Sequence, residues 1–166
     1  EMAKFLHLVD QLPDRFFKYR VMTHLAFFLG LRREEIVGLT WKHVNCKNGS
    51  LEISQALSYI VGVPLKVKAP KNEVSNRTLG LSQEHRDLLL HQQELQKAAF
   101  KKANLVWTES CFIFTQLKST DPMHGNSYNT WLKKFLSNTD LPKSSIHKNK
   151  MMTSPIKSLN NIEGRP

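Results

Sequence analysis

The stretch FFLGLRREEIVGLTWKHVN, residues 27–45, joins two segments of apolar, helical pattern across a glycine and two arginines. Gly30 predicts the end of the first helix, because glycine readily takes the left-handed conformation found after helix C-termini. Arg32 and Arg33 follow at once, before a second helical pattern that runs toward Trp41. A guanidinium is planar, permanently charged and able to donate two parallel hydrogen bonds to a phosphate. Its place at a junction of two apolar segments therefore indicates an anion-binding role.

The composition also favours an anionic partner. The 166-residue chain is 40% hydrophobic, which is enough for a folded core, and its 24 Lys+Arg against 14 Asp+Glu give a net charge of +10. This excess predicts nucleic acid first and an acidic membrane surface second. Cys46 and Cys111 lie far apart and lack metal-ligand spacing, which favours a reduced, cytoplasmic protein. The sequence shows neither the apolar length of a membrane helix nor the pattern of a signal peptide.

Apolar periodicity predicts helices at both ends of the ordered part of the chain. Two N-terminal helices cover residues 1–12 and 15–29, the second buried on most sides, and a short helix follows the two arginines. Ser82 is placed to cap a long helix, and residues 127–138 form an amphipathic one. After Pro142 the pattern fades, and we expect residues 148–166 to be a divergent, basic and poorly ordered tail.

Three segments between these helices alternate between apolar and polar residues. They cover residues 50–58, 63–70 and 76–82, and such alternation predicts short antiparallel strands. The expected fold class is therefore α+β and mainly helical, with a small three-stranded antiparallel sheet.

This order of elements, together with three motifs, resembles the catalytic domain of the tyrosine recombinases, the phage-integrase family. The first motif of the family is Gly-Leu-Arg with an acid three residues later, here Gly30 to Arg32 and then Glu35. The second places a lysine between two strands, here Lys71 in PKNEVSNRTLGL (70–81). The third is His-x-x-Arg; here it supplies His147, with Lys150 in the place of the second arginine.

The resemblance implies a chemistry and a role for each matching residue. The family breaks and rejoins DNA through a tyrosine that becomes joined to the 3′-phosphate, and needs neither a metal nor a nucleotide cofactor. Arg32 would stabilise the negative charge of the transition state. Lys71 would act as the general acid that protonates the leaving 5′-oxygen, and His147 would assist proton transfer or bind a non-bridging oxygen. Glu35 is expected to orient or bury the junction.

The resemblance covers residues 1–147, which we interpret as a partial integrase catalytic domain. The expected partners are double-stranded DNA and other recombinase protomers on it. Further phosphate contacts are expected from basic residues that surround the motifs. These candidates are Arg33, Lys66, Lys68, Arg77, Lys133 and Lys134.

The sequence departs from the family at the nucleophile. No tyrosine follows Tyr128, and both Tyr19 and Tyr128 fall on apolar helix faces. We therefore expect a truncated or degenerate integrase of a mobile element, inactive in DNA cleavage by itself. The alternatives are a non-catalytic DNA-binding remnant and a fragment without present function. A metal-dependent nuclease is disfavoured, because the carboxylates are scattered along the chain rather than clustered.

Overall fold

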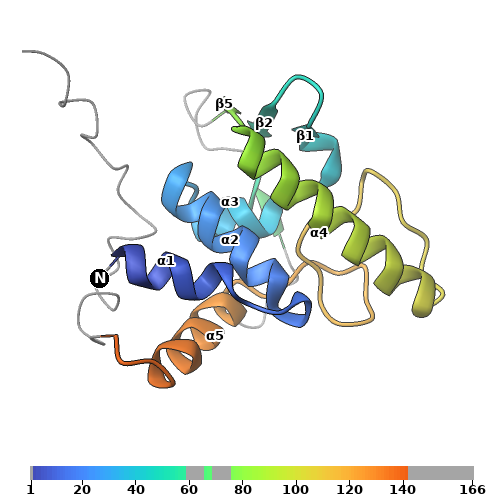
Figure 1. The fold of residues 1–166 in the computed structure, drawn as a ribbon. Coiled ribbons are helices and arrows are strands. Elements are labelled where there is room, and N and C mark those ends of the chain that lie inside the picture. The colour runs from blue at the N-terminus through green and yellow to red at the C-terminus, as the bar shows by residue number, and fades with distance from the viewer. Residues whose placement is uncertain (1, 59–65, 69–75, 142–166) are drawn as a thin grey trace, which may run out of the picture.

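The computed structural model describes residues 2–58, 66–68 and 76–141 of the chain (Figure 1). The helices of this part are α1 (Met2–Asp10), α2 (Phe17–Phe28), α3 (Arg33–Gly38), α4 (Gln83–Lys102) and α5 (Asn126–Ser137). Its strands are β1 (Val44–Asn45), β2 (Ser50–Ile53), β3 (Ala56–Ser58), β4 (Lys66–Lys68) and β5 (Arg77–Gly80). The mainly helical α+β class predicted from the sequence is confirmed.

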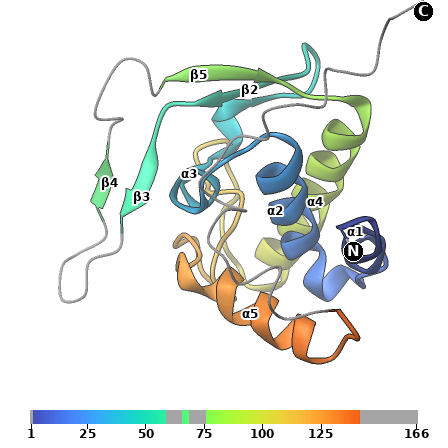
Figure 2. The ribbon, with the colours of Figure 1, turned by 90° about the vertical axis from the view of Figure 1, so that its left-hand side faces the viewer.

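Helix α2 lies at the centre of the helical part, with α4 beside it and α1 and α3 against it (Figures 1 and 2). Every residue from Val21 to Ala26 is buried, so the helix packs on most sides, as its apolar density predicted. Helix α5 crosses beneath this layer, and the ring of its Trp131 stacks on Tyr19 of α2, with 4.5 Å between the ring centroids. One core therefore holds α2, α4 and α5 together.

Two predicted helix boundaries are confirmed in atomic detail. Gly30 has a φ of +64° directly after α2, and the N–H of Leu31 turns back to donate to the carbonyl of Leu25 at 3.3 Å. Ser82 precedes α4, and its hydroxyl oxygen accepts the N–H of His85 at 3.3 Å. The Leu31 N–H, turned back by Gly30, and the Ser82 hydroxyl each satisfy a backbone group that a helix end leaves without an intrahelical partner.

The sheet is antiparallel and three-stranded, but not all of the predicted strands form it. Its order is β1–β2–β5, whereas β3 and β4 form a separate two-stranded ribbon beside α3 (Figure 2). The single strand predicted over residues 50–58 is thus wrong, because the chain leaves the ladder at residues 54–55. There the side chain of Gln55 donates to the carbonyl of Gly38, and the backbone passes so close that a Cβ on Gly38 would lie 3.3 Å from the Gln55 oxygen.

The segment between α4 and α5 is fixed by a buried glutamine. The side-chain oxygen of Gln96 accepts the indole N–H groups of Trp41 at 2.6 Å and Trp107 at 3.1 Å. Its amide donates to the carbonyl of Phe112 at 2.8 Å. Gln96 therefore links α4 to Trp107 and Phe112 in the segment between α4 and α5. It also links α4 to Trp41, which precedes β1.

We expect Gln96→Ala to lower the free energy of unfolding by about 2–4 kcal/mol, because two indole N–H groups would be left without an acceptor in a buried place. The measurement is urea denaturation followed by tryptophan fluorescence. The control is Gln83→Ala at the exposed start of the same helix, for which a change within about 0.5 kcal/mol is expected. Equal effects of the two substitutions would contradict the proposed importance of this network.

Candidate active site and DNA interface

Arg32 lies in the link between α2 and α3, with its backbone fixed and its side chain exposed. Its φ and ψ of −75° and 152° are those of an extended residue that precedes a helix. Its N–H donates to Oε2 of Glu35 at 2.8 Å, and its carbonyl accepts the N–H of Ile36 at 2.9 Å. The first contact is the backbone half of a capping box. Within the described residues, no hydrogen bond or ion pair occupies the guanidinium, which is therefore available to a ligand.

The carboxylate that fixes Arg32 is itself fixed from the sheet. Glu35 is only 6% exposed. Arg77 of β5 donates to it through both terminal nitrogens, Nη1 to Oε1 at 2.9 Å and Nη2 to Oε2 at 2.9 Å. Two parallel charge-assisted bonds of this kind define both distance and orientation. Glu35 thus joins the N-terminus of α3 to a strand that lies 42 residues further along the chain.

Strand register explains how Arg77 reaches this position. Arg77 lies opposite Ile53 in the antiparallel pairing of β2 with β5. Side chains alternate between the faces of a strand, so Arg77 shares a face with Leu79, which packs against the core. The inward face of β5 therefore presents one apolar side chain to the core and one guanidinium to α3.

The Glu35–Arg77 pair remains charged across the neutral pH range. Burial by itself raises the pKa of Glu35, but the hydrogen bonds from Arg77 and from the Arg32 amide, with the two positive charges, outweigh it and hold the pKa below its ordinary value. The hydrogen bond to Glu35 raises the pKa of Arg77. Most of the Arg77 charge is thus balanced inside the protein, whereas that of Arg32 faces solvent.

Arg33, the second arginine of the junction, is held by its neighbours. Its Nε and Nη2 donate to Oε1 of Glu34 at 3.1 Å and 2.7 Å, and its Nη1 donates to Oδ1 of Asn126 at 3.1 Å. Asn126 is the first residue of α5, so Arg33 ties the start of α5 to the start of α3. A DNA contact by Arg33 remains a prediction.

The other predicted residues are only partly brought to this place. Lys133 and Lys134 are exposed on α5, about 10–12 Å along the helix from Asn126 at the usual rise per residue. Lys66 and Lys68 begin and end strand β4. Lys71 and His147 lie outside the residues that the structure describes, so their predicted meeting with Arg32 remains a prediction. So does a phosphate contact by Arg77, whose side chain the structure places on Glu35.

Sequence reasoning missed the pairing of Glu35 with Arg77. It assigned Glu35 to the junction and Arg77 to DNA, and each assignment was made from a separate motif. The available signal was the alternation of β5, which puts Arg77 on the same face as the apolar Leu79, where an unpaired charge is unfavourable. In the part of the chain that the structure describes, no group of three or more His, Cys, Asp or Glu side chains could hold a metal ion.

The fold is that of solved integrase structures. The Tn1549 transposon integrase in complex with circular intermediate DNA matches with a TM-score of 0.66 and 22% sequence identity, over 87% of this chain and 47% of that one. The same integrase in complex with transposon right end DNA matches with a TM-score of 0.65 and 21% identity, over 86% of this chain and 46% of that one. These likenesses identify the architecture as that of an integrase.

One sequence relative is also an integrase. The chain is 25% identical over 147 residues to the ICEBs1 integrase of Bacillus subtilis (strain 168), which is 89% of this chain and 38% of the relative. No family model matches the sequence. With the shared fold, this similarity supports a place for the chain in the tyrosine recombinase family. The chain spans less than half of the length of these relatives.

We expect Glu35→Gln to lower the free energy of unfolding by about 1.5–3 kcal/mol at pH 7, because hydrogen bonds to a charged acceptor are lost and Arg77 is left unpaired. Since the pKa of Glu35 lies below its ordinary value of 4.5, its charge stabilises the fold above that pH. The stabilisation is lost as the pH falls through the folded-state pKa. Wild type and variant should therefore converge in acid.

Denaturant unfolding at a series of pH values measures both effects. Glu34→Gln is the matched control, because Glu34 pairs with Arg33 at the surface and its replacement should change stability by no more than about 1 kcal/mol. A Glu35→Gln variant as stable as Glu34→Gln at pH 7 would refute the role given to the Glu35–Arg77 pair.

Proposed function

We propose that this chain is the phosphate-binding part of an integrase catalytic domain and binds double-stranded DNA through Arg32. The observation that carries the proposal is the contrast between the two arginines bound to Glu35: Arg77 turns its guanidinium inward, while Arg32 offers only its backbone and leaves its guanidinium exposed. The net charge of +10 favours the same polyanionic partner. The solved integrases that share the fold are bound to DNA.

In this proposal, Arg32 stabilises charge that develops on a DNA phosphodiester. Attack on the phosphorus gathers negative charge on its non-bridging oxygens, and a preorganised donor lowers the barrier by roughly 3 kcal/mol. The fixed backbone of Arg32 supports such preorganisation, because only side-chain torsions remain to be set on binding. Lys71 as general acid and His147 as its partner complete the proposed site.

None of the tyrosines that the structure describes is suited to act as the nucleophile. Tyr128 is 2% exposed and shares a hydrogen bond of 2.8 Å with Thr23. The Thr23 hydroxyl donates to the carbonyl of Tyr19, so the phenol of Tyr128 is the donor to Thr23 and keeps its proton. Burial raises the pKa of Tyr128 to about 12. The ring of Tyr19 is stacked on Trp131, and burial raises its pKa as well.

We therefore infer that these residues provide DNA binding and transition-state stabilisation but not strand cleavage. Site-specific recombination, as a family function, would require a tyrosine nucleophile, a role that neither Tyr19 nor Tyr128 fits. The second candidate function, a non-catalytic DNA-binding remnant, is favoured by the burial of Tyr128. We also propose that the chain acts together with other recombinase protomers on the same DNA. The two free cysteines support a cytoplasmic location as part of this proposal. None of the helices that the structure describes has the length and apolar character needed to span a membrane.

Arg32→Ala should weaken binding to a mixed-sequence duplex about tenfold and reduce the salt dependence by about one counterion, since it removes one charged phosphate contact. Fluorescence anisotropy between 50 and 200 mM salt measures both quantities. Lys102→Ala, at the exposed end of α4, removes the same charge elsewhere and should alter affinity by no more than about twofold. Binding that survives Arg32→Ala unchanged would leave the remnant as the better description.

A nicked suicide duplex, which traps the covalent intermediate of strand cleavage, should yield no protein–DNA adduct with this chain. The reason is that Tyr19 and Tyr128 are stacked or buried and hold their protons. Denaturing electrophoresis detects an adduct, and mass spectrometry locates it. An adduct at Tyr59, the remaining tyrosine of the sequence, would overturn the inference that the chain lacks a nucleophile.

A further inference from the structure

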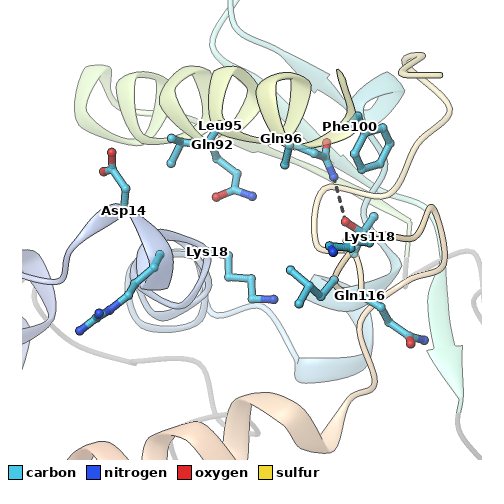
Figure 3. A pocket seen from close by; sticks show the side chains of 12 residues that line it. Asp14, Lys18, Gln92, Leu95, Gln96, Phe100, Gln116 and Lys118 are labelled. Atoms are coloured by element: carbon cyan, nitrogen blue, oxygen red, sulfur yellow. Dashed lines mark hydrogen bonds between the residues drawn. The ribbon is translucent and has the colours of Figure 1, made fainter. Parts of the chain in front are cut away.

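A second cationic site lies at the other end of α2 from Arg32. A pocket of about 190 Å³ opens between the first turn of α2, the second half of α4 and the loop of residues 115–118 (Figure 3). Lys18 extends into it from α2, below Gln92 and Gln96 of α4 (Figure 3). Ten residues, or about 15 Å of helix, separate Lys18 from Phe28, where α2 ends before Arg32. The pocket is therefore distinct from the Arg32 site.

The ammonium of Lys18 lacks a counter-charge. Burial lowers the pKa of Lys18, and no carboxylate acts on it in the opposite direction. Among the described residues, no acid lies within ion-pair distance of its Nζ. Asp14, the acid that lines the pocket, lies instead 3.3 Å from Nε2 of His91. The aromatic ring of Tyr19, with its centroid 5.4 Å from Nζ, is the partner of Lys18.

A second lysine reaches the pocket from a fixed loop. Lys118 lines the pocket and has a φ of +54°, a left-handed conformation that is unfavourable for a residue with a side chain. Two hydrogen bonds across the turn hold it there: the N–H of Gln116 donates to the carbonyl of Asp121 at 2.9 Å, and Ser119 donates to the Asp121 carboxylate at 2.8 Å. The loop thus holds a second cation beside an uncompensated one.

We propose that this pocket binds a phosphate group between the ammonium groups of Lys18 and Lys118. With Arg15 at the rim, three cationic side chains line the pocket against one carboxylate, a balance that suits a doubly charged anion better than a singly charged one. The volume admits a tetrahedral oxyanion with some water, but is below that of sites for drug-sized ligands. The phosphate group belongs either to free inorganic phosphate or to the DNA backbone.

The first experiment titrates the chain with inorganic phosphate and follows the backbone amides of residues 115–118 by NMR. Saturable shifts with a dissociation constant in the millimolar range are expected. Lys18→Met, which keeps the aliphatic stem, and Lys118→Asn, which keeps a residue that tolerates positive φ, should each weaken binding at least tenfold. Lys4→Met, at an exposed position of α1 that does not line the pocket, is the control and should leave binding unchanged. Undiminished binding by Lys18→Met would overturn the proposal.

The second experiment requires no variant and separates the two sources. The chain is acetylated briefly with an amine-reactive ester, and mass spectrometry gives the rate at each lysine, with and without ligand. Phosphate in the pocket should slow acetylation of Lys18 at least threefold and leave the exposed Lys4 of α1 unaffected. Protection by inorganic phosphate identifies the free anion as a ligand, whereas protection by duplex DNA alone assigns the phosphate to the DNA backbone.

Absence of protection by either ligand would refute the phosphate site. The outcome is separable from the proposed function, because the DNA binding assigned to Arg32 is measured with Lys18 intact. A chain that binds DNA in an Arg32-dependent manner without protecting Lys18 in either arm retains the first proposal and loses this one.

Discussion

The carboxylate of Glu35 is the constraint on which the candidate site depends. It is buried, so its charge is tolerated only with donors on both oxygens, and it receives three of them. Two come from the guanidinium of Arg77 and one from the backbone of Arg32. A buried ion pair of this geometry joins the sheet to α3 and sets the direction in which the chain leaves the end of α2. The exposed guanidinium of Arg32 is a consequence of that arrangement.

The same contact divides two tasks between two arginines. Arg77 is held by a paired carboxylate and stabilises the fold, while Arg32 is held by its backbone and keeps its side chain for a ligand. A single arginine could not do both, because a guanidinium neutralised by a carboxylate offers less attraction to a phosphate. This division gives a physical reason for an acid three residues after Arg32, and explains why an acid at a proposed DNA interface is not repulsive: its charge is already satisfied.

Helix α2 organises the rest of the molecule. The buried middle of α2 packs against α4 and α5. The two proposed cationic sites lie at its ends: the Arg32 junction follows Phe28, and the Lys18 pocket lies at the first turn. Thr23, in the buried middle, accepts a hydrogen bond from the phenol of Tyr128 and so holds a tyrosine of α5 in the core. The helix that leads to the proposed phosphate-binding arginine therefore also buries a tyrosine, which is then unsuited to act as a nucleophile.

The sequence by itself determined what depends on near neighbours. Periodicity locates the helices, Gly30 marks the end of α2 and Ser82 the start of α4, and the motif around Arg32 places that residue at a junction. The family resemblance rested on the same local motifs. Alternation also identified β5 as a strand. These features depend on interactions between residues that are close in the sequence. Such interactions can be predicted from residue type and spacing.

Only the tertiary structure decided what depends on distant partners. The split of residues 50–58 into β2 and β3 follows from the close approach of Gly38, and the short β1 has too few residues to show an alternation. The pairing of Arg77 with Glu35 requires the register of β2 with β5. No local pattern encodes which charge meets which across 42 residues, because that choice is made by packing and by the high free energy of leaving either charge buried alone.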